Sequence, residues 1–443
     1  MRIDKVRIRN FRGIEDLEIN LHKQFNLFIG ENGAGKTAIL EALAVAVGSF
    51  FSGMPGVQSR HIRITDIRYF KTPEGSYEYT ANTKIEVLNA QINGKEISWY
   101  KERNGPKGSN IMGKGSPIRT LSEELNSTLK DSKRTNPMDL PVIAYYSTAR
   151  LWKVHNENKK EEATNDSTVR RLPTRYRGYK DALEIRSTFK IMLDWFKSKF
   201  SEIIVNQNST FQLDCVRDVI INNIPGATKV KWVFDKDQIQ MLYIVFDNGL
   251  ETPFHFLSDG YRNLLAIFAD LAYRCVTLNP HFGKEANLKS EGIVLIDELD
   301  LHLHPAWQQD LVKNLKQTFP KIQFIATTHS PFILQEMEDN EVFKINSTAD
   351  KILAPLKGLN RLGVEDIAED IQGVDTPNMS HEREEMFKAA EKYYSLLNLS
   401  DKETNPGVLQ DLKDKLDSIT EKYSDDVAYY AFLKQERLAR GIK

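Results

Sequence analysis

Eight residues near the N-terminus have the types and spacing of a phosphate-binding loop. Gly30–Thr37 reads GENGAGKT and lies between an apolar run at 25–29 and an apolar-rich run at 37–47. Glycines let backbone N–H groups approach phosphate oxygens, and the N-terminus of a helix adds positive potential. We expect Lys36 to neutralise the terminal phosphates of ATP and the Thr37 hydroxyl to ligate Mg²⁺. The expected nucleotide contacts are Gly30, Asn32, Gly33, Ala34, Gly35, Lys36, Thr37 and Ala38.

A second stretch combines a buried strand with two carboxylates. Residues 292–300 read GIVLIDELD, in which an apolar run ends at Asp297 and Glu298. Asp297 would share the Mg²⁺ shell with Thr37. Glu298 would point toward the terminal phosphate and polarise a water molecule as a general base. A plain helix cap at the end of a strand is the alternative interpretation.

A third stretch, FLSDGYRNLL at 256–265, places Ser258, Asp259 and Gly260 before an apolar helix that begins near Tyr261. Ser and Asp are good N-cap residues, so the stretch could simply start a helix. A serine hydroxyl and a bare glycine amide at a helix N-terminus also form an anion site. Both interpretations are open at this level.

Alternating strands and helices must position these residues, and they predict a mostly parallel sheet. Expected strands span 3–9, 15–21, 25–29, two runs within 83–101 around Asn93-Gly94, 140–152, 229–235, 239–247, 293–297, 322–327 and 341–346. Expected helices span 37–47, 121–129, 182–200, 208–224, 260–278, 306–318 and a short run from Pro331, with a mobile loop at 153–180 and a charged, helical tail after 350.

Composition is that of an ordinary globular protein. The chain has 443 residues, 41% hydrophobic and 27% charged, with a net charge of −1, so no global basic field indicates nucleic acid. Cys215 and Cys275 lie in apolar helical patterns and predict buried thiols rather than a disulfide. We expect neither a signal peptide nor a membrane span, and a cytoplasmic protein.

The motifs together resemble the ABC-type ATPases of the branch that holds RecF, Rad50 and the SMC proteins. The resemblance is carried by IRNFRGIEDLEINL, FIGENGAGKTAILEAL, LSDGYRNLLAIFADLA, LIDELDLHLHPAWQ and FIATTHSPFIL. It implies an α/β fold: an ABC-type P-loop ATPase head with a mixed sheet, a helical insertion and a helical C-terminal tail. The expected parts are residues 1–90, an insertion at 91–228, a second lobe at 229–350 and a tail at 351–443.

The same resemblance assigns further roles. Ser258 and Gly260 correspond to a signature motif that binds the nucleotide of a second copy, although Asp259 replaces the usual glycine. His329 would contact the terminal phosphate, and Asp300 would communicate between the two sites. Asn10 and Arg12 match positions near the nucleotide, and Gln58 is a weak candidate for the glutamine loop. The pair His302 and His304 could hold a metal, but Pro305 favours a simple helix start.

Size, the run YYSTARLW and the helical tail look most like the ATPase subunits of the anti-phage systems Septu and some retrons. This resemblance implies a homodimer or higher even-numbered oligomer, slow ATP hydrolysis and an HNH-type nuclease partner. The alternative is a RecF-like DNA-binding clamp. Two basic stretches, 60–71 and 169–180, favour it because they could contact the phosphates of DNA. The second stretch contains Arg170, Arg171, Arg175, Arg177 and Lys180 beside Tyr176 and Tyr179. A scaffold that binds ATP without hydrolysis conflicts with the intact Asp297-Glu298 pair, and the start NFRG does not suit a membrane-transporter ATPase.

Overall fold

The computed structural model describes residues 1–112, 116–130, 137–151, 174–184, 189–206, 210–234, 240–345, 352–375 and isolated positions between 377 and 414. It forms two compact units, Met1–Val364 and Glu365–Lys443. Every candidate site residue belongs to the first unit. The helices expected in the tail lie mainly outside the described residues.

The N-terminal sheet is mostly antiparallel. Its strands are β1 (Arg2–Phe11), β2 (Ile14–Asn20), β6 (Thr83–Ile92), β7 (Lys95–Arg103), β8 (Asn110–Ile111) and β16 (Ile352–Leu353), in the order β16-β2-β1-β6-β7-β8. Alternation buries Ile3, Val6 and Ile8 of β1 while its charged residues stay partly exposed. Asn93 and Gly94 both have positive φ, +49° and +76°, as a two-residue hairpin turn requires. This hairpin is therefore confirmed.

The second sheet is mostly parallel and carries the site. Its strands are β3 (Phe25–Ile29), β9 (Val142–Tyr146), β13 (Gly292–Ile296), β14 (Ile322–Thr327), β15 (Val342–Lys344) and β17 (Pro355–Leu356), in the order β17-β15-β3-β14-β13-β9. Only β17 runs antiparallel to its neighbour. All residues of β3, β9, β13 and β14 are buried, because layers cover both faces. Because these four strands run parallel, their carboxyl ends lie at the same edge of the sheet.

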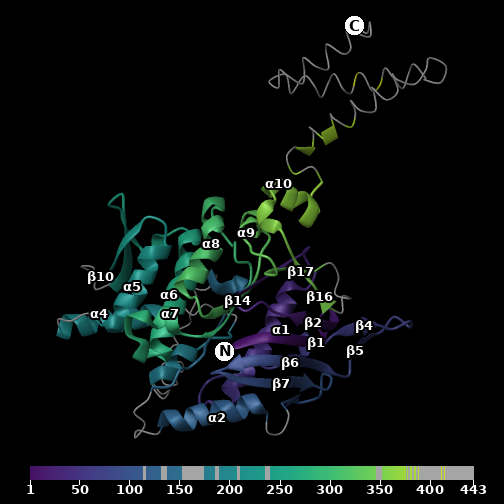
Figure 1. Cartoon of the computed structure of the whole chain (residues 1–443), viewed down its shortest axis with the longest axis horizontal. Coiled ribbons are helices and arrows are strands. Elements are labelled where there is room, and N and C mark those ends of the chain that lie inside the picture. The colour runs from purple at the N-terminus through teal and green to yellow at the C-terminus, as the bar shows by residue number, and fades with distance from the viewer. Residues whose placement is uncertain are drawn as a thin grey trace. The chain divides into compact units, whose positions relative to one another are not determined.

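Helices α1 (Lys36–Gly48), α5 (Phe211–Asn223), α6 (Asp259–Leu278) and α8 (Pro305–Thr318) form most of the helical layers. Shorter or peripheral helices are α2 (Pro117–Lys130), α4 (Phe189–Asn206), α7 (Ala286–Lys289) and α9 (Pro331–Gln335). Figure 1 shows α4–α8 gathered in one lobe and β1, β2 and β4–β7 in the other. The run Lys36–Gly53 is apolar and long enough to cross a membrane, but 89% of it is buried inside the protein, as in a core helix.

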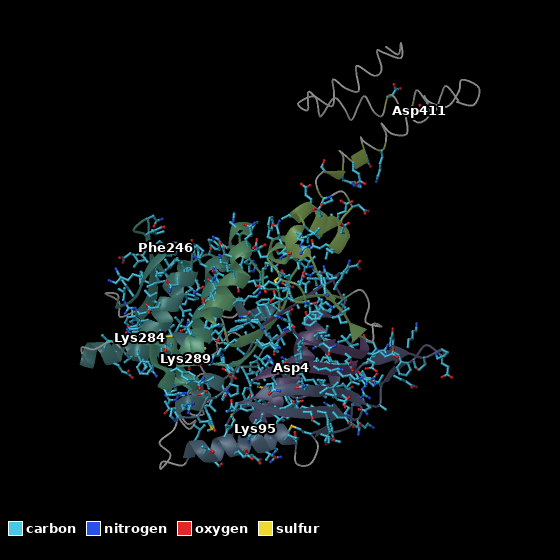
Figure 2. The ribbon with its side chains drawn as sticks, viewed as in Figure 1. Asp4, Lys95, Phe246, Lys284, Lys289 and Asp411 are labelled. Atoms are coloured by element: carbon cyan, nitrogen blue, oxygen red, sulfur yellow. The ribbon has the colours of Figure 1, made fainter. Side chains whose placement is uncertain are left out.

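A third, antiparallel sheet precedes α6. It contains β10 (Ala227–Phe234), β11 (Gln240–Phe246) and β12 (Glu251–Pro253), of which β12 was not expected from the sequence. Phe246, labelled in Figure 2, ends β11, and its ring centroid lies 5.2 Å from that of Tyr261 on α6. This contact ties the sheet to the first turn of α6.

Several expected boundaries were wrong. Residues 174–179 form a 3₁₀ turn in which Tyr176 and Tyr179 are buried, so this end of the expected mobile loop is ordered by packing. The rest of that loop, 153–173, lies outside the described residues. The helix expected from 182 begins at Phe189, and β9 ends at Tyr146 rather than at 152. A hairpin of β4 (Tyr69–Lys71) and β5 (Tyr77–Tyr79) was missed.

Candidate nucleotide-binding and catalytic site

The phosphate loop connects β3 to α1, as its sequence predicts. Gly30, Gly33 and Gly35 all have positive φ (+149°, +84° and +102°), a region that side chains disfavour. A Cβ atom on Gly30 would lie 2.6 Å from the carbonyl oxygen of Ile345, whereas one on Gly33 would meet nothing within 4 Å. Glycine is therefore required at position 30 because the Ile345 backbone passes so close to it. At position 33 only the backbone conformation favours glycine, because the space around it is open. Asn32 is exposed, Ala34 is half-buried and Ala38 is buried at the start of α1.

Lys36 is held inside this loop. Its side chain is largely buried, and Nζ donates to the carbonyl oxygens of Gly30 (2.8 Å) and Glu31 (2.9 Å). Burial lowers the pKa of Lys36, while the nearby carboxylates of Asp297, Glu298 and Asp300 act in the opposite direction. The ammonium is thus placed in the loop that would receive phosphate groups.

The phosphate-loop helix and the acidic strand meet through oxygen atoms. Thr37 Oγ1 donates to Asp297, at 3.1 Å from Oδ2 and 3.3 Å from Oδ1. Thr327 Oγ1 at the end of β14 donates to Asp297 Oδ1 at 2.7 Å. A hydroxyl and a carboxylate side by side are the hard oxygen ligands that Mg²⁺ takes in nucleotide sites, so these residues fit the metal.

Glu298 has an unusual backbone. Its φ is +48°, a conformation that costs a non-glycine residue about 1–2 kcal/mol. Its N–H donates to Thr327 Oγ1 (2.8 Å), and its carbonyl accepts from the N–H of Leu301 (3.1 Å). The end of β14 therefore holds Glu298 in place, and strain fixed by its surroundings is a common feature of functional positions.

His329 and Asp300 lie together at the same edge. Thr328 Oγ1 donates to Asp300 Oδ1 (2.5 Å), and the backbone N–H of His329 donates to the same oxygen (3.3 Å). The His329 residue is exposed. The turn after β13 and the turn after β14 are therefore joined through the carboxylate of Asp300.

Ser258, Asp259 and Gly260 begin α6 as expected. Ser258 is the N-cap residue, but its side chain makes no capping hydrogen bond, and the residue is exposed. Gly260 is buried, and a Cβ there would lie 2.8 Å from the carbonyl oxygen of His302. Packing thus explains the glycine, whereas the hydroxyl of the exposed Ser258 has no role in capping the helix. In the described part of the chain, no hydrogen bond or ion pair joins 258–260 to the phosphate loop.

Arg12 contacts α1, the helix that follows the phosphate loop. Its Nε and Nη2 donate to Asp66 Oδ1 (3.0 and 2.9 Å), and its guanidinium pairs with Glu41 on α1. Asn10, by contrast, donates from Nδ2 to the carbonyl of Asn82 (2.8 Å) and has a φ of +51° near the end of β1. Arg12 therefore braces α1, while Asn10 has a local structural partner.

The H-x-H pair has a structural explanation. His304 is the N-cap of α8, and its Nδ1 accepts from the N–H of Ala306 at 3.3 Å. Pro305 occupies the first turn of that helix, as its position in the sequence predicts.

Sequence reasoning missed a buried network behind the site. Tyr146 accepts from the N–H of Asp297 through its carbonyl (2.8 Å), and its hydroxyl donates to Asp270 Oδ2 (2.8 Å). Arg274 Nε donates to the same carboxylate oxygen (2.7 Å). Burial and the Asp270 charge raise the pKa of Tyr146 well above its usual value, so it stays neutral. An Asp and an Arg four residues apart inside an apolar helix was the signal available in the sequence.

Part of the second basic stretch is engaged inside the protein. Arg175 donates to the carbonyl oxygens of Leu278 (2.6 Å) and Met138 (2.5 Å), so its proposed contact with phosphate was wrong. Tyr176 and Tyr179 are 1% exposed and offer no stacking face. Arg177 is exposed, and Arg170 and Arg171 lie outside the described residues.

Two protein-family models match the chain. One is described as "AAA domain" and matches residues 5–212; the other is described as "AAA domain, putative AbiEii toxin, Type IV TA system" and matches residues 120–335. Together they span the phosphate loop, residues 258–260 and the acidic strand.

Curated relatives match over most of the chain. "Retron Vc95 probable ATPase" of Vibrio cholerae serotype O1 biovar El Tor is 26% identical, over 89% of this chain and 84% of the relative. "Retron Ec83 probable ATPase" of Escherichia coli is 24% identical, over 80% and 73%. "Septu protein PtuA" of Bacillus thuringiensis is 27% identical, over 84% of each.

Shorter and weaker similarities also occur. "DNA replication and repair protein RecF" of Coxiella burnetii is 46% identical over 50 residues, 11% of this chain and 14% of the relative. An SMC head bound to the C-winged helix domain of ScpA covers 82% of this chain and all of its own, with a TM-score of 0.48 and 13% identity. The phosphate loop, the acidic strand and the matches to AAA-domain models indicate an ATPase, and the chain is similar to the retron ATPases and to Septu protein PtuA.

Proposed function

We propose that the chain is the regulatory ATPase of a bacterial anti-phage defence complex, in which slow ATP hydrolysis controls a partner nuclease. The contact of Thr37 with Asp297 carries the ATPase half of this proposal, because it joins the phosphate loop to the acidic strand. The defence half is supported by relatives named for retron and Septu systems, which match 80% or more of the chain.

The residues divide the chemistry of hydrolysis among them. Lys36 and the amides of the phosphate loop bind the phosphates, and Thr37 and Asp297 hold Mg²⁺, which when bound neutralises charge on phosphate oxygens. Glu298 positions and deprotonates the attacking water, and its backbone strain is consistent with that role. His329 contacts the terminal phosphate from the adjacent turn.

The signature stretch acts on another copy of the chain. Ser258 is exposed, its hydroxyl caps no amide, and Gly260 packs on the segment after the acidic strand. In a head-to-tail homodimer, or a higher even-numbered oligomer, this helix N-terminus would close over the nucleotide of the partner subunit. Each composite site would then need two chains.

The partner is an HNH-type nuclease, by resemblance to the Septu and retron systems, and the complex works in the cytoplasm. Co-purification tests this directly: the chain is expressed with its neighbouring genes and isolated with ATP present. A stoichiometric nuclease that is lost from the Lys36→Ala variant is the expected result. Recovery of the chain alone, or with DNA-repair factors, would count against the defence role.

A RecF-like DNA clamp is the second candidate, because Arg63 and Arg177 are exposed and a RecF protein matches a short segment. It predicts duplex binding that weakens steeply with salt and is lost when Arg170, Arg171 and Arg177 become Ala. Arg175 is left unchanged in this test because it holds the fold together.

A further inference from the structure

A cavity of about 260 Å³ lies outside the nucleotide site. One wall is the segment 56–61 with Arg63, and the other is the segment 179–184; we call this cavity the lateral pocket. Neither the phosphate loop nor residues 258–260 line it, and of the residues considered for the nucleotide site only Gln58, the weak candidate for the glutamine loop, does so. The proposed ATPase chemistry therefore leaves this space without a role.

The lining is rich in cationic donors. Arg63 is exposed and Lys180 half-buried, and in the described ranges no carboxylate lies within ion-pair distance of either side chain. Asp181 and Glu184 are the carboxylates of the lining, against Arg60, Arg63 and Lys180. The lining therefore carries three cations against two carboxylates, and two of these cations, Arg63 and Lys180, have no carboxylate partner in the described part of the chain.

Arg60 adds a buried donor to this lining. It is 6% exposed, and its Nη2 lies 3.3 Å from Glu41. Its Nε is buried and has no hydrogen-bond partner among the described residues. A buried donor without an acceptor costs stability, so it favours a ligand that supplies one.

Lys101 supports the same wall from behind. It is 3% exposed, and its Nζ donates to the carbonyl oxygen of Arg60 (2.7 Å) and to Ser59 Oγ (3.3 Å). Within the described part of the chain it has no carboxylate partner, and burial lowers its pKa to about 8. An anion in the lateral pocket would offset this uncompensated positive charge.

Hydrogen bonds connect the two walls to two different helices. Ser59 Oγ donates to the carbonyl of Gly48 at the end of α1 (2.6 Å), the helix that begins with the phosphate loop. Arg274 Nη1 on α6, the signature helix, donates to the carbonyls of Gly178 (2.8 Å) and Lys180 (3.3 Å). A ligand between the walls would therefore bridge α1 and α6.

We propose that the lateral pocket binds a small phosphorylated anion, and that this ligand couples α1 to α6 and so alters ATP turnover. Guanidinium and ammonium groups together suit a phosphate dianion. The volume lies below the ~300–1,000 Å³ of pockets that hold drug-sized ligands, which favours a phosphate ester of modest size. Binding is independent of the proposed function, whereas the effect on turnover rests on it.

The test measures thermal stability of the full chain against ribose 5-phosphate, with orthophosphate and ribose as comparison probes. Three variants accompany the wild type: Lys36→Ala disables the phosphate loop, Arg63→Gln with Lys180→Gln disables the lateral pocket, and Lys313→Gln with Lys321→Gln removes two exposed charges elsewhere. Lys180→Gln alone replaces the double variant if the latter fails to fold.

Ribose 5-phosphate should raise the Tm of the wild type, of Lys36→Ala and of the Lys313/Lys321 variant. In the Arg63/Lys180 variant the apparent Kd should increase about tenfold or more. Orthophosphate acting equally well would identify the free anion as the ligand, and ribose should have no effect. A shift that disappears in Lys36→Ala but persists in the Arg63/Lys180 variant would overturn the proposal, as would no shift in any protein. Binding of ribose 5-phosphate to the Lys36→Ala variant requires no ATP hydrolysis. A failure of the binding proposal is therefore distinguishable from a failure of the proposed function.

Discussion

The hydroxyl of Thr37 lies 3.1 Å from Oδ2 of Asp297, although 260 positions separate the two residues in the sequence. One stands at the first turn of α1 and the other at the end of β13. Thr327 donates to the same carboxylate from β14, so three elements converge on one oxygen-lined point. This convergence is what makes the phosphate loop and the acidic strand a single site.

Loss of the Thr37 hydroxyl should weaken Mg²⁺-dependent hydrolysis. Thr37→Val removes an oxygen but keeps the side-chain shape, and we expect an activity loss of about 10–100-fold, the equivalent of ~1.5–3 kcal/mol for a bond to a charged group. Thr37→Ser, the matched control, should keep most of the activity. Phosphate release measured across a Mg²⁺ titration distinguishes them; equal rates for the two variants would contradict the assignment.

Glu298→Gln should abolish hydrolysis and leave ATP binding intact. The amide has the same shape but cannot accept a proton, and loss of a general base costs about 10²–10⁴-fold in rate. The strained backbone is unchanged, so the Tm should match that of the wild type. Phosphate release and equilibrium nucleotide binding are the measurements. Hydrolysis at the wild-type rate would show that another group is the base.

Two glycines of the phosphate loop should respond differently to alanine. At Gly30 a Cβ meets the Ile345 carbonyl at 2.6 Å and φ is +149°, whereas at Gly33 φ is +84° and the space is open. Gly33→Ala should cost only backbone strain, ~1–2 kcal/mol, and Gly30→Ala a further ~1–3 kcal/mol for the displaced backbone. Urea unfolding of both variants measures the difference; equal stabilities would mean that the loop moves freely at Ile345.

The parts of the candidate site that are formed by residues adjacent in the sequence could be predicted from the sequence. The phosphate loop and the Asp297-Glu298 pair follow from local patterns that combine a strand end with a helix start, whereas the roles expected for Ser258 and His329 came from the family resemblance. Asp270, Tyr146 and Arg274 were missed because their importance arises from burial and from contacts across elements. Arg175 was assigned to phosphate binding for the same reason. The sequence shows a charged stretch, but only the fold shows that Arg175 donates to the carbonyl oxygens of Leu278 and Met138.

The fold shows a similar division. Strands buried on both faces, such as β3 and β13, appear as plain apolar runs and were found within a residue or two. The turn at 174–179 carries no periodic pattern and is fixed by Tyr176, Tyr179 and Arg274, so the sequence suggested a loop instead. Tertiary contacts decide such segments, and local propensity does not.

Lys101 should make stability depend on pH. Its pKa is lowered to about 8 by burial, against about 10.4 for an unperturbed lysine. Between these values the unfolded chain binds more protons than the folded chain, so stability rises with pH in this window. Well below pH 8 Lys101 is protonated in both states, and its contribution to stability no longer changes with pH.

We expect the free energy of unfolding of the wild type, relative to Lys101→Met, to increase by about 2 kcal/mol between pH 7.5 and 10. Ser59, Arg60 and His61 face or neighbour Lys101 and are common to both proteins, so their effects largely cancel. Lys95→Met, at an exposed position on β7, is the control and should show no such trend. A flat difference for Lys101→Met would mean that its ammonium is solvated.

The most direct test of the account mixes two inactive variants, Lys36→Ala and Ser258→Arg, and measures phosphate release. In a head-to-tail dimer each mixed pair contains one site with both Lys36 and Ser258 intact, so equal mixing should restore about a quarter of the wild-type activity per chain. Each variant alone should remain inactive. If the chains exchange between dimers but the mixture releases phosphate only at the summed rate of the two variants, a site built from two copies of the chain is contradicted.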